Sequence, residues 1–348
     1  MMSNSPHPWS GKTEVSASTA PRPAPGPAPE PAPRPAPGPT IERPLLFRSG
    51  EAQLCGMLHL PASAVETQPD IGLVFAQSGA RGRLGNTFHY PYFARRLSAV
   101  GYPCLRFDPA GLGDSTGEIP AGNMRDLYGQ IGAGRFVGDT LSAIDELYRQ
   151  ISPKRVVLFG VCGGAITALM AAPRSERVDG VILLSLPVML DSAQQGQLGR
   201  MPHDYARNYL FRLYANKLLS LKAWKRLITR KSDTANIWSW VKASFLPQVH
   251  QARPGGTAGE RDPAFNHHVL ESLDALVARQ RKLLLLFGQD DKIRYEWQRD
   301  FHDKYWNTNP RYEACSTIHN IANCNHMFTL REWQATAMDL AITWLQSL

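Results

Sequence analysis

Residues 155–170, R-V-V-L-F-G-V-C-G-G-A-I-T-A-L-M, decide the fold of this 348-residue chain. A run of strand formers reaches Gly160, and a helical pattern starts after Gly164. Cys162 stands between these glycines, so the stretch resembles a nucleophile elbow, G-x-S-x-G, with cysteine in place of serine. A strand that turns sharply into a helix crowds its own backbone, so small residues are needed on both sides of the nucleophile. The stretch therefore predicts a strand, a tight turn that presents Cys162, and a helix.

The predicted helix would place its N-terminus at the cysteine. The partial positive charge there favours a thiolate, and the free N–H groups can hold an oxyanion. Gly163, directly after the nucleophile, is predicted to give one oxyanion donor. The second should come from the glycine-rich segment Q-S-G-A-R-G-R-L-G after an earlier strand, where Ala80 is the first choice and Gly79 the second.

A nucleophile of this kind needs an acid and a base that follow it in the order Cys, Asp, His. The apolar run K-L-L-L-L-F is followed by G-Q-D-D, and the spacing favours Asp291 over Asp290 as the orienting carboxylate. His326 lies in I-A-N-C-N-H-M-F-T, after the last predicted strand and before the last helix. His319 is expected to lie within that strand, so His326 is the predicted general base.

Apolar strands alternate with helical patterns along most of the chain. This order is typical of an α/β fold with a mostly parallel sheet of about eight strands and helices on both faces. The predicted strands are two short ones from Glu42 onward, then 71–79, 103–108, 155–161, 178–187, 282–291 and Tyr312–His319. The predicted helices outside the elbow are 91–102, 134–150 and 332–345.

Two segments depart from this alternation. Residues 1–41 include proline at every odd position from 21 to 39, and this predicts an extended or disordered tether. Residues 191–281 interrupt the core, 42–190 and 282–348, and are predicted to form an inserted helical cap. Such insertions at strand ends usually bind or gate substrate. The cap carries a basic run without an intervening acid: Arg212, Lys217, Lys222, Lys225, Arg226, Arg230 and Lys231.

Composition narrows the classes of function. The net charge is +8, but we find no nucleic-acid-binding motif. The five cysteines show no zinc-like spacing, so we expect reduced thiols in a cytoplasmic protein with no metal and no cofactor. No secretory signal and no apolar run long enough to span a membrane are recognised.

The segment R-F-D-P-A-G-L-G-D-S-T-G (106–117) resembles the D-x-x-G-x-G-x-S loop of α/β-hydrolases. Together with F-G-V-C-G-G-A and the cap, it resembles the hydrolases of exosortase-type polysaccharide systems, which carry cysteine at the elbow, as dienelactone hydrolases do. The resemblance covers about residues 42–348. It implies a Cys-His-Asp triad of Cys162, His326 and Asp291. It does not identify a substrate, because this fold hosts many chemistries.

The cysteine itself favours particular substrates. Thiolate is a better leaving group than alkoxide, so Cys162 would be expelled again from an intermediate formed with an alkyl ester. A thioester has a matched leaving group, which predicts a thioesterase or acyltransferase acting on coenzyme A or carrier-protein thioesters. The basic cap would steer such acidic donors. The alternatives are an esterase of the dienelactone type, a carbon–carbon bond hydrolase and a non-catalytic hydrolase-fold scaffold.

Overall fold

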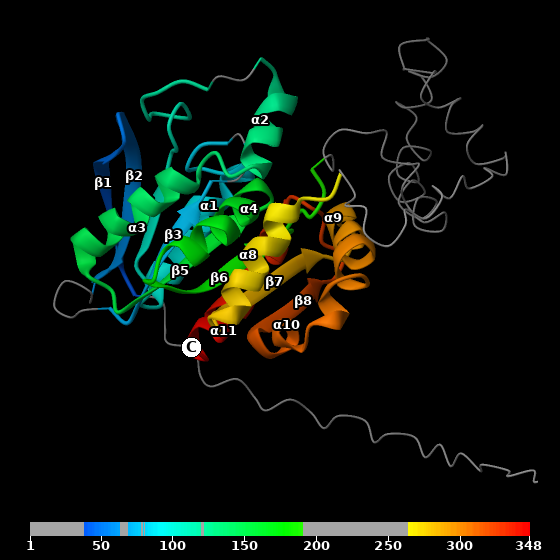
Figure 1. Ribbon diagram of the computed structural model, residues 1–348. Helices are drawn as coiled ribbons and strands as arrows, with labels where there is room; N and C mark the ends of the chain where they lie inside the picture. Colours follow the sequence, from blue (N-terminus) through cyan, green and yellow to red (C-terminus); the bar gives the residue numbers. More distant parts are fainter. Residues whose placement is uncertain (1–37, 63–68, 78, 80, 120–121, 191–263) are drawn as a thin grey trace, which may run out of the picture. The chain divides into compact units, whose positions relative to one another are not determined.

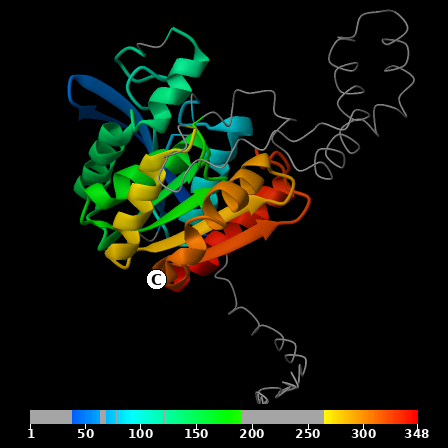
Figure 2. The ribbon, with the colours of Figure 1, turned by 45° about the vertical axis from the view of Figure 1, so that its right-hand side comes forward.

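The computed structural model describes residues 38–348 except 63–68, 78, 80, 120–121 and 191–263. Eight strands in this part form one sheet (Figures 1 and 2). They are β1 (Thr40–Ser49), β2 (Ala52–Pro61), β3 (Ile71–Ala76), β4 (Cys104–Phe107), β5 (Arg155–Val161), β6 (Val178–Leu184), β7 (Lys282–Gly288) and β8 (Ser316–Ile321). Their order across the sheet is β1-β2-β4-β3-β5-β6-β7-β8.

Only the first strands of the sheet are antiparallel. β1 pairs with β2, and β2 with β4, in antiparallel register, whereas the strands from β4 to β8 run parallel. The central parallel strands are buried along nearly their whole length, because helices cover both faces. The predicted mostly parallel sheet of about eight strands is confirmed. Its parallel strands bring their carboxyl ends to one edge, where sites form in such sheets.

Helices cover both faces of the sheet (Figure 1). They include α1 (His89–Ala99), α2 (Met124–Gly132), α3 (Val137–Ile151), α4 (Gly163–Ala171), α8 (His267–Ala278), α9 (Lys292–Glu296), α10 (Pro310–Cys315) and α11 (Arg331–Gln346). Helices α3, α4 and α8 pack on one face, and α1 and α11 on the other. Every residue of α4 is buried, because it lies between the sheet and its neighbouring helices. This burial holds the helix that follows the elbow in place.

Residues 264–281 differ from the sequence prediction, which assigned them to the cap. They include α8, whose Val269, Leu273, Leu276 and Val277 are buried in the same core as α4. The apolar face of α8 covers the sheet, so the core resumes earlier than residue 282. The other cap residues, including the basic run from Arg212 to Lys231, and nearly all of the proline-rich leader lie outside the described residues.

The last predicted strand also begins later than expected. Tyr312 lies in α10, and β8 starts at Ser316. Asn309 caps α10 by accepting a hydrogen bond from the Arg311 N–H, and the buried Tyr312 hydroxyl donates to Asp274 of α8. Tertiary contacts therefore fix a short helix where residue preferences indicate a strand. His319 does lie within β8, as predicted.

The glycine-rich loop after β4 has a structural role. Asp108 is buried and accepts a hydrogen bond from the Asp114 N–H at 3.0 Å. Ser115 Oγ donates to the Asp108 carbonyl at 2.6 Å, and a Cβ on Gly113 would overlap the Asp108 carboxylate. These contacts fold the loop onto the end of β4. No helix among the described residues is both long and apolar enough to cross a membrane.

Candidate active site

Cys162 stands at a strained turn between β5 and α4. Its φ is 54° and its ψ −117°, a backbone conformation that L-residues rarely adopt and that clusters at functional sites. A Cβ on Gly164 would lie 2.5 Å from the Gln77 carbonyl oxygen, and one on Gly160 would overlap the Gly164 carbonyl. The two glycines are therefore required by close backbone approach. The elbow predicted from the sequence is the conformation observed.

Replacing Gly160 with alanine is expected to destabilise the protein by about 3 kcal/mol or more, because the new methyl group would meet fixed backbone. Gly138→Ala is the matched control: it lies within α3, and a Cβ there has nothing within 4 Å. That change should stabilise by about 0.5–1 kcal/mol. Urea unfolding of both variants measures the difference. Equal midpoints would show that the elbow does not need glycine at this position.

Tyr90 of α1 fixes the strand ends around the elbow. Its hydroxyl donates to the Ala76 carbonyl at 2.7 Å and accepts from the Val161 N–H at 3.2 Å. The side chain is fully buried and packs edge-on against Phe75 and near Phe159. A buried hydroxyl that joins the ends of β3 and β5 limits movement of the residue next to Cys162. The sequence pattern gave no sign of this contact.

The structure brings His326 and Asp291 together. His326 Nδ1 lies 3.1 Å from each carboxylate oxygen of Asp291. Asp291 is fully buried, and its Oδ1 also accepts a hydrogen bond from the Ile293 N–H at 2.8 Å, which caps α9. This second bond holds the carboxylate in position toward the imidazole. Asp291, rather than its neighbour Asp290, is the acid in contact with His326.

The charge state of His326 follows from its neighbours. Burial alone would disfavour the imidazolium, but the charges of Cys162 and Asp291, and hydrogen bonds with both, raise the pKa of His326 well above its usual range. Cys162 is half-buried, and its charge acts on the imidazole that Asp291 orients. Cys162, His326 and Asp291 therefore lie together in the structure.

Two of the candidate oxyanion donors, Gly163 and Gly79, are in contact beside the elbow. Gly163 is the first residue of α4, where backbone N–H groups have no acceptor within the helix. A Cβ on Gly163 would lie 3.0 Å from Gly79 Cα, so the two backbone segments are in contact. The Gly79 N–H is already bonded to the Gln77 carbonyl at 3.0 Å. Ala80, the first choice for the second donor, lies outside the described residues.

Tyr128 of α2 is a site residue that the sequence analysis missed. Its ring lies against Gly79, since a Cβ there would be 3.2 Å from Tyr128 Cε1. Burial and the charge of Cys162 raise the pKa of the Tyr128 hydroxyl, while Arg81 and His326 lower it. Tyr128 is thus a neutral donor near both Cys162 and His326. The stretch M-R-D-L-Y-G-Q-I-G has the apolar spacing of a helix, which is the signal that could have located it.

A second thiol lies close to the triad but is protected. Cys324 is buried, and burial together with the charges of Asp291 and Asp290 raises its pKa to about 12. It donates to the Asn325 carbonyl at 3.3 Å. At neutral pH it is therefore a structural thiol rather than a nucleophile.

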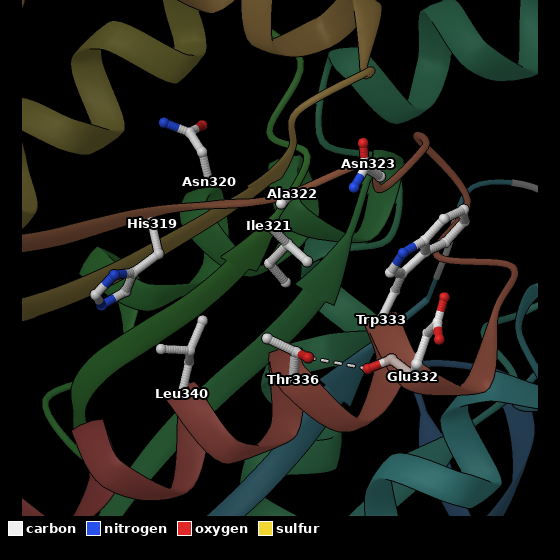
Figure 3. A pocket seen from close by; sticks show the side chains of 9 residues that line it. All are labelled: His319, Asn320, Ile321, Ala322, Asn323, Glu332, Trp333, Thr336 and Leu340. Atoms are coloured by element: carbon white, nitrogen blue, oxygen red, sulfur yellow. Dashed lines mark hydrogen bonds between the residues drawn. The ribbon is translucent and has the colours of Figure 1, made fainter.

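A hollow of about 540 Å³ lies between β8 and α11 (Figure 3). Its lining residues are His319, Asn320, Ile321, Ala322, Asn323, Glu332, Trp333, Thr336 and Leu340. Thr336 Oγ1 donates to the Glu332 carbonyl at 3.0 Å, the bond drawn in Figure 3. Its lining does not include Cys162, His326, Asp291 or Gly163, so the hollow is distinct from the candidate active site.

Comparison with known proteins identifies the family. The model of the alpha/beta hydrolase family matches residues 73–339, which include the elbow, Asp291 and His326. The chain belongs to the alpha/beta hydrolase family. No curated protein sequence matches this α/β hydrolase.

The chain is similar in fold to solved structures of other hydrolases. A dienelactone hydrolase from Anabaena variabilis has a TM-score of 0.51 at 16% identity, over 88% of this chain and 98% of its own. An esterase from Pyrococcus furiosus has a TM-score of 0.52 at 14% identity, over 88% of this chain and 90% of its own. These likenesses show the fold that this α/β hydrolase shares with them, and at such identities nothing finer.

Proposed function

We propose that this α/β hydrolase is an acyl-transfer enzyme that acts on acyl thioesters through Cys162, His326 and Asp291. The supporting observation is a half-buried cysteine at the elbow beside a histidine whose pKa is raised by that cysteine and by Asp291. A protonated imidazole next to a thiol stabilises the thiolate, which is the reactive form. The acyl donor would be a thioester of coenzyme A or of an acyl carrier protein.

The first half of the reaction forms an acyl-cysteine. The Cys162 thiolate attacks the thioester carbonyl carbon, and the electron pair of the C=O bond moves to oxygen, where the Gly163 N–H can stabilise it. The intermediate collapses by breaking the bond between carbon and the donor sulfur. The departing thiolate takes the proton of the His326 imidazolium, which leaves neutral histidine and acylated Cys162.

The second half removes the acyl group. Water, or an amine or alcohol acceptor, attacks the acyl-cysteine while neutral His326 takes its proton. The Cys162 thiolate then leaves, and the imidazolium faces it again. Asp291 remains ionised and stabilises the imidazolium throughout. Because acyl-cysteine is itself a thioester, transfer to an amine or alcohol is as feasible as hydrolysis.

The leaving groups decide which substrates turn over. The alkoxide of an ordinary alkyl ester leaves less readily than the Cys162 thiolate. The intermediate formed with such an ester therefore returns to substrate. We expect wild-type kcat/KM for an acyl thioester to exceed that for the alkyl ester of the same acid by at least about 100-fold. Paired steady-state measurements with one acyl group test this. A wild-type preference for the alkyl ester would contradict the leaving-group argument.

The alternatives give different results in the same measurement. An enol ester also has a good leaving group, as in the chemistry named for the dienelactone hydrolase of similar fold. Activity confined to enol esters or to a carbon–carbon bond substrate would replace the thioester assignment. A scaffold without chemistry would turn over none of these substrates.

A further inference from the structure

A pocket of about 410 Å³ beside the loop that carries His326 is lined by three arginines. Its lining residues are Leu84, Phe88, Pro91, Tyr92, Arg95, Arg106 and Arg331. It contains no acidic lining residue. Arg106 is 4% exposed, whereas Arg331 and Arg95 lie on the surface. A buried guanidinium at the base of a pocket, with a second at its rim, is unusual unless an anion compensates it.

Among the described residues, a carboxylate forms an ion pair with Arg95 but with neither of the other two arginines. Glu42 forms an ion pair with Arg95, which is half exposed. In the residues that the structure describes, neither Arg106 nor Arg331 has an ion-pair partner: Arg331 Nη1 donates to Gln334 Oε1 at 2.9 Å, and its guanidinium stacks 4.2 Å from the Tyr92 ring centre. Their charges remain available to a ligand.

The contacts of Arg106 orient its guanidinium toward the pocket. Its Nε donates to His59 Nε2 at 2.8 Å, and its Nη1 donates to the Arg83 carbonyl at 3.1 Å. Burial and the charge of Arg106 lower the pKa of His59 to about 4, so His59 is neutral and accepts this bond. Both hydrogen-bond partners are neutral acceptors, and Glu42 and Asp108 act on the guanidinium through their charges without an ion pair. Burial also lowers the pKa of Arg106 to about 10.

The pocket lies on the same edge of the sheet as the elbow. Arg106 is near the carboxyl end of β4, which runs parallel to β3, and β3 to β5, at whose end Cys162 stands. Arg331 follows His326 by five residues in the sequence. Asn86, between Leu84 and Phe88, donates from Nδ2 to Met327 Sδ at 3.7 Å. The pocket therefore borders the loop that carries the proposed base.

The walls of the pocket suit a group with an apolar part. Phe88 is 65% and Leu84 43% exposed at its rim, and Tyr92 and Pro91 complete an aromatic and apolar surface. Arginine binds phosphate through paired N–H groups, and aromatic rings stack on a planar base. We propose that this pocket binds the phosphate-bearing part of the acyl donor, with Arg106 and Arg331 on the phosphate. The assignment to the donor rests on the proposed thioester function, whereas the phosphate site does not.

Phosphate binding can be tested without turnover. We expect inorganic phosphate, compared with chloride at equal ionic strength, to raise the melting temperature of the full chain in a saturable way. Arg331→Gln should abolish the shift, and it should fold normally because the side chain is exposed. The control is Arg279→Gln, an exposed arginine bonded to Glu176, which should keep the shift. No shift in the wild type, or a full shift in Arg331→Gln, would overturn the site.

A second arm tests where the phosphate comes from. The substrates are one acyl group on coenzyme A and on pantetheine, which lacks phosphate. If the donor supplies the phosphate, Arg331→Gln lowers kcat/KM about tenfold for the coenzyme A thioester and leaves the pantetheine thioester unchanged. Equal effects on both substrates, with phosphate binding intact in the wild type, would overturn the link to the donor. Absence of turnover in the wild type would count against the proposed function alone, because the thermal shift measures phosphate binding in the pocket independently of turnover.

Discussion

Cys162→Ala is expected to lower kcat for acyl thioesters by about 10⁴-fold or more, because no other group at the elbow can form the acyl intermediate. Another thiol, Cys324, is buried and has a pKa raised to about 12. The fold should persist, since alanine removes one sulfur from a half-buried position. Initial rates with a single thioester at saturating concentration measure the loss.

Two further variants make this result specific. Cys55→Ala alters a half-buried thiol in β2 and should keep kcat within about twofold. Cys162→Ser keeps a nucleophile, but the serine alkoxide is a poorer leaving group than the cysteine thiolate. The ratio of thioester to alkyl-ester activity should therefore fall. Thioester turnover by Cys162→Ala above one hundredth of the wild-type rate would remove Cys162 from the mechanism.

Asp291→Asn is expected to lower kcat on the order of 10⁴-fold, because a neutral amide neither stabilises the His326 imidazolium nor fixes its tautomer. Asparagine retains an oxygen that can accept from the Ile293 N–H and so can keep the cap of α9. Asp290→Asn is the matched control at the adjacent position and should retain most activity. Equal losses in the two variants would contradict the assignment of the orienting acid.

The same substitution should change how the protein responds to pH. In the wild type the pKa of His326 is raised above its usual value of about 6.5, and Asp291→Asn should lower it. A raised pKa means that the stabilisation from this group is full below pH of about 6.5 and is lost as pH rises through the folded-state pKa. Imidazole NMR titrations of both proteins measure the shift. An unchanged midpoint would show that Asp291 does not control the charge of His326.

The sequence predicted most of the sheet and the residues of the candidate triad. Strands such as β5 and β7 are continuous apolar runs, which only burial on both faces explains. Chain order then placed Asp291 and His326 after the last two strands of the sheet. The G-x-C-x-G spacing indicated the strained turn directly, because Gly160 and Gly164 allow a backbone contact that no side chain permits.

The remaining features depend on contacts between distant segments. The sequence assigned α8 to the predicted helical cap, and only its packing on α4 separates it from the cap. Arg106 stands in an apolar strand, and only its bonds to His59 and Arg83 direct its guanidinium to a pocket. Tyr128 joins the site because α2 lies beside Gly79. The local preferences of residues do not show which distant segments will be in contact in the fold.

The most direct test of the proposed chemistry is intact-mass analysis of the wild-type protein mixed briefly with a panel of acyl thioesters and quenched in acid. The account predicts a mass increase equal to one acyl group, mapped by peptide analysis to Cys162 and lost with hydroxylamine, as expected for a thioester bond. Cys162→Ala, which retains the other four cysteines, should show no adduct. Turnover of the thioester with no acyl group on Cys162, or with the acyl group on another residue, would contradict the account.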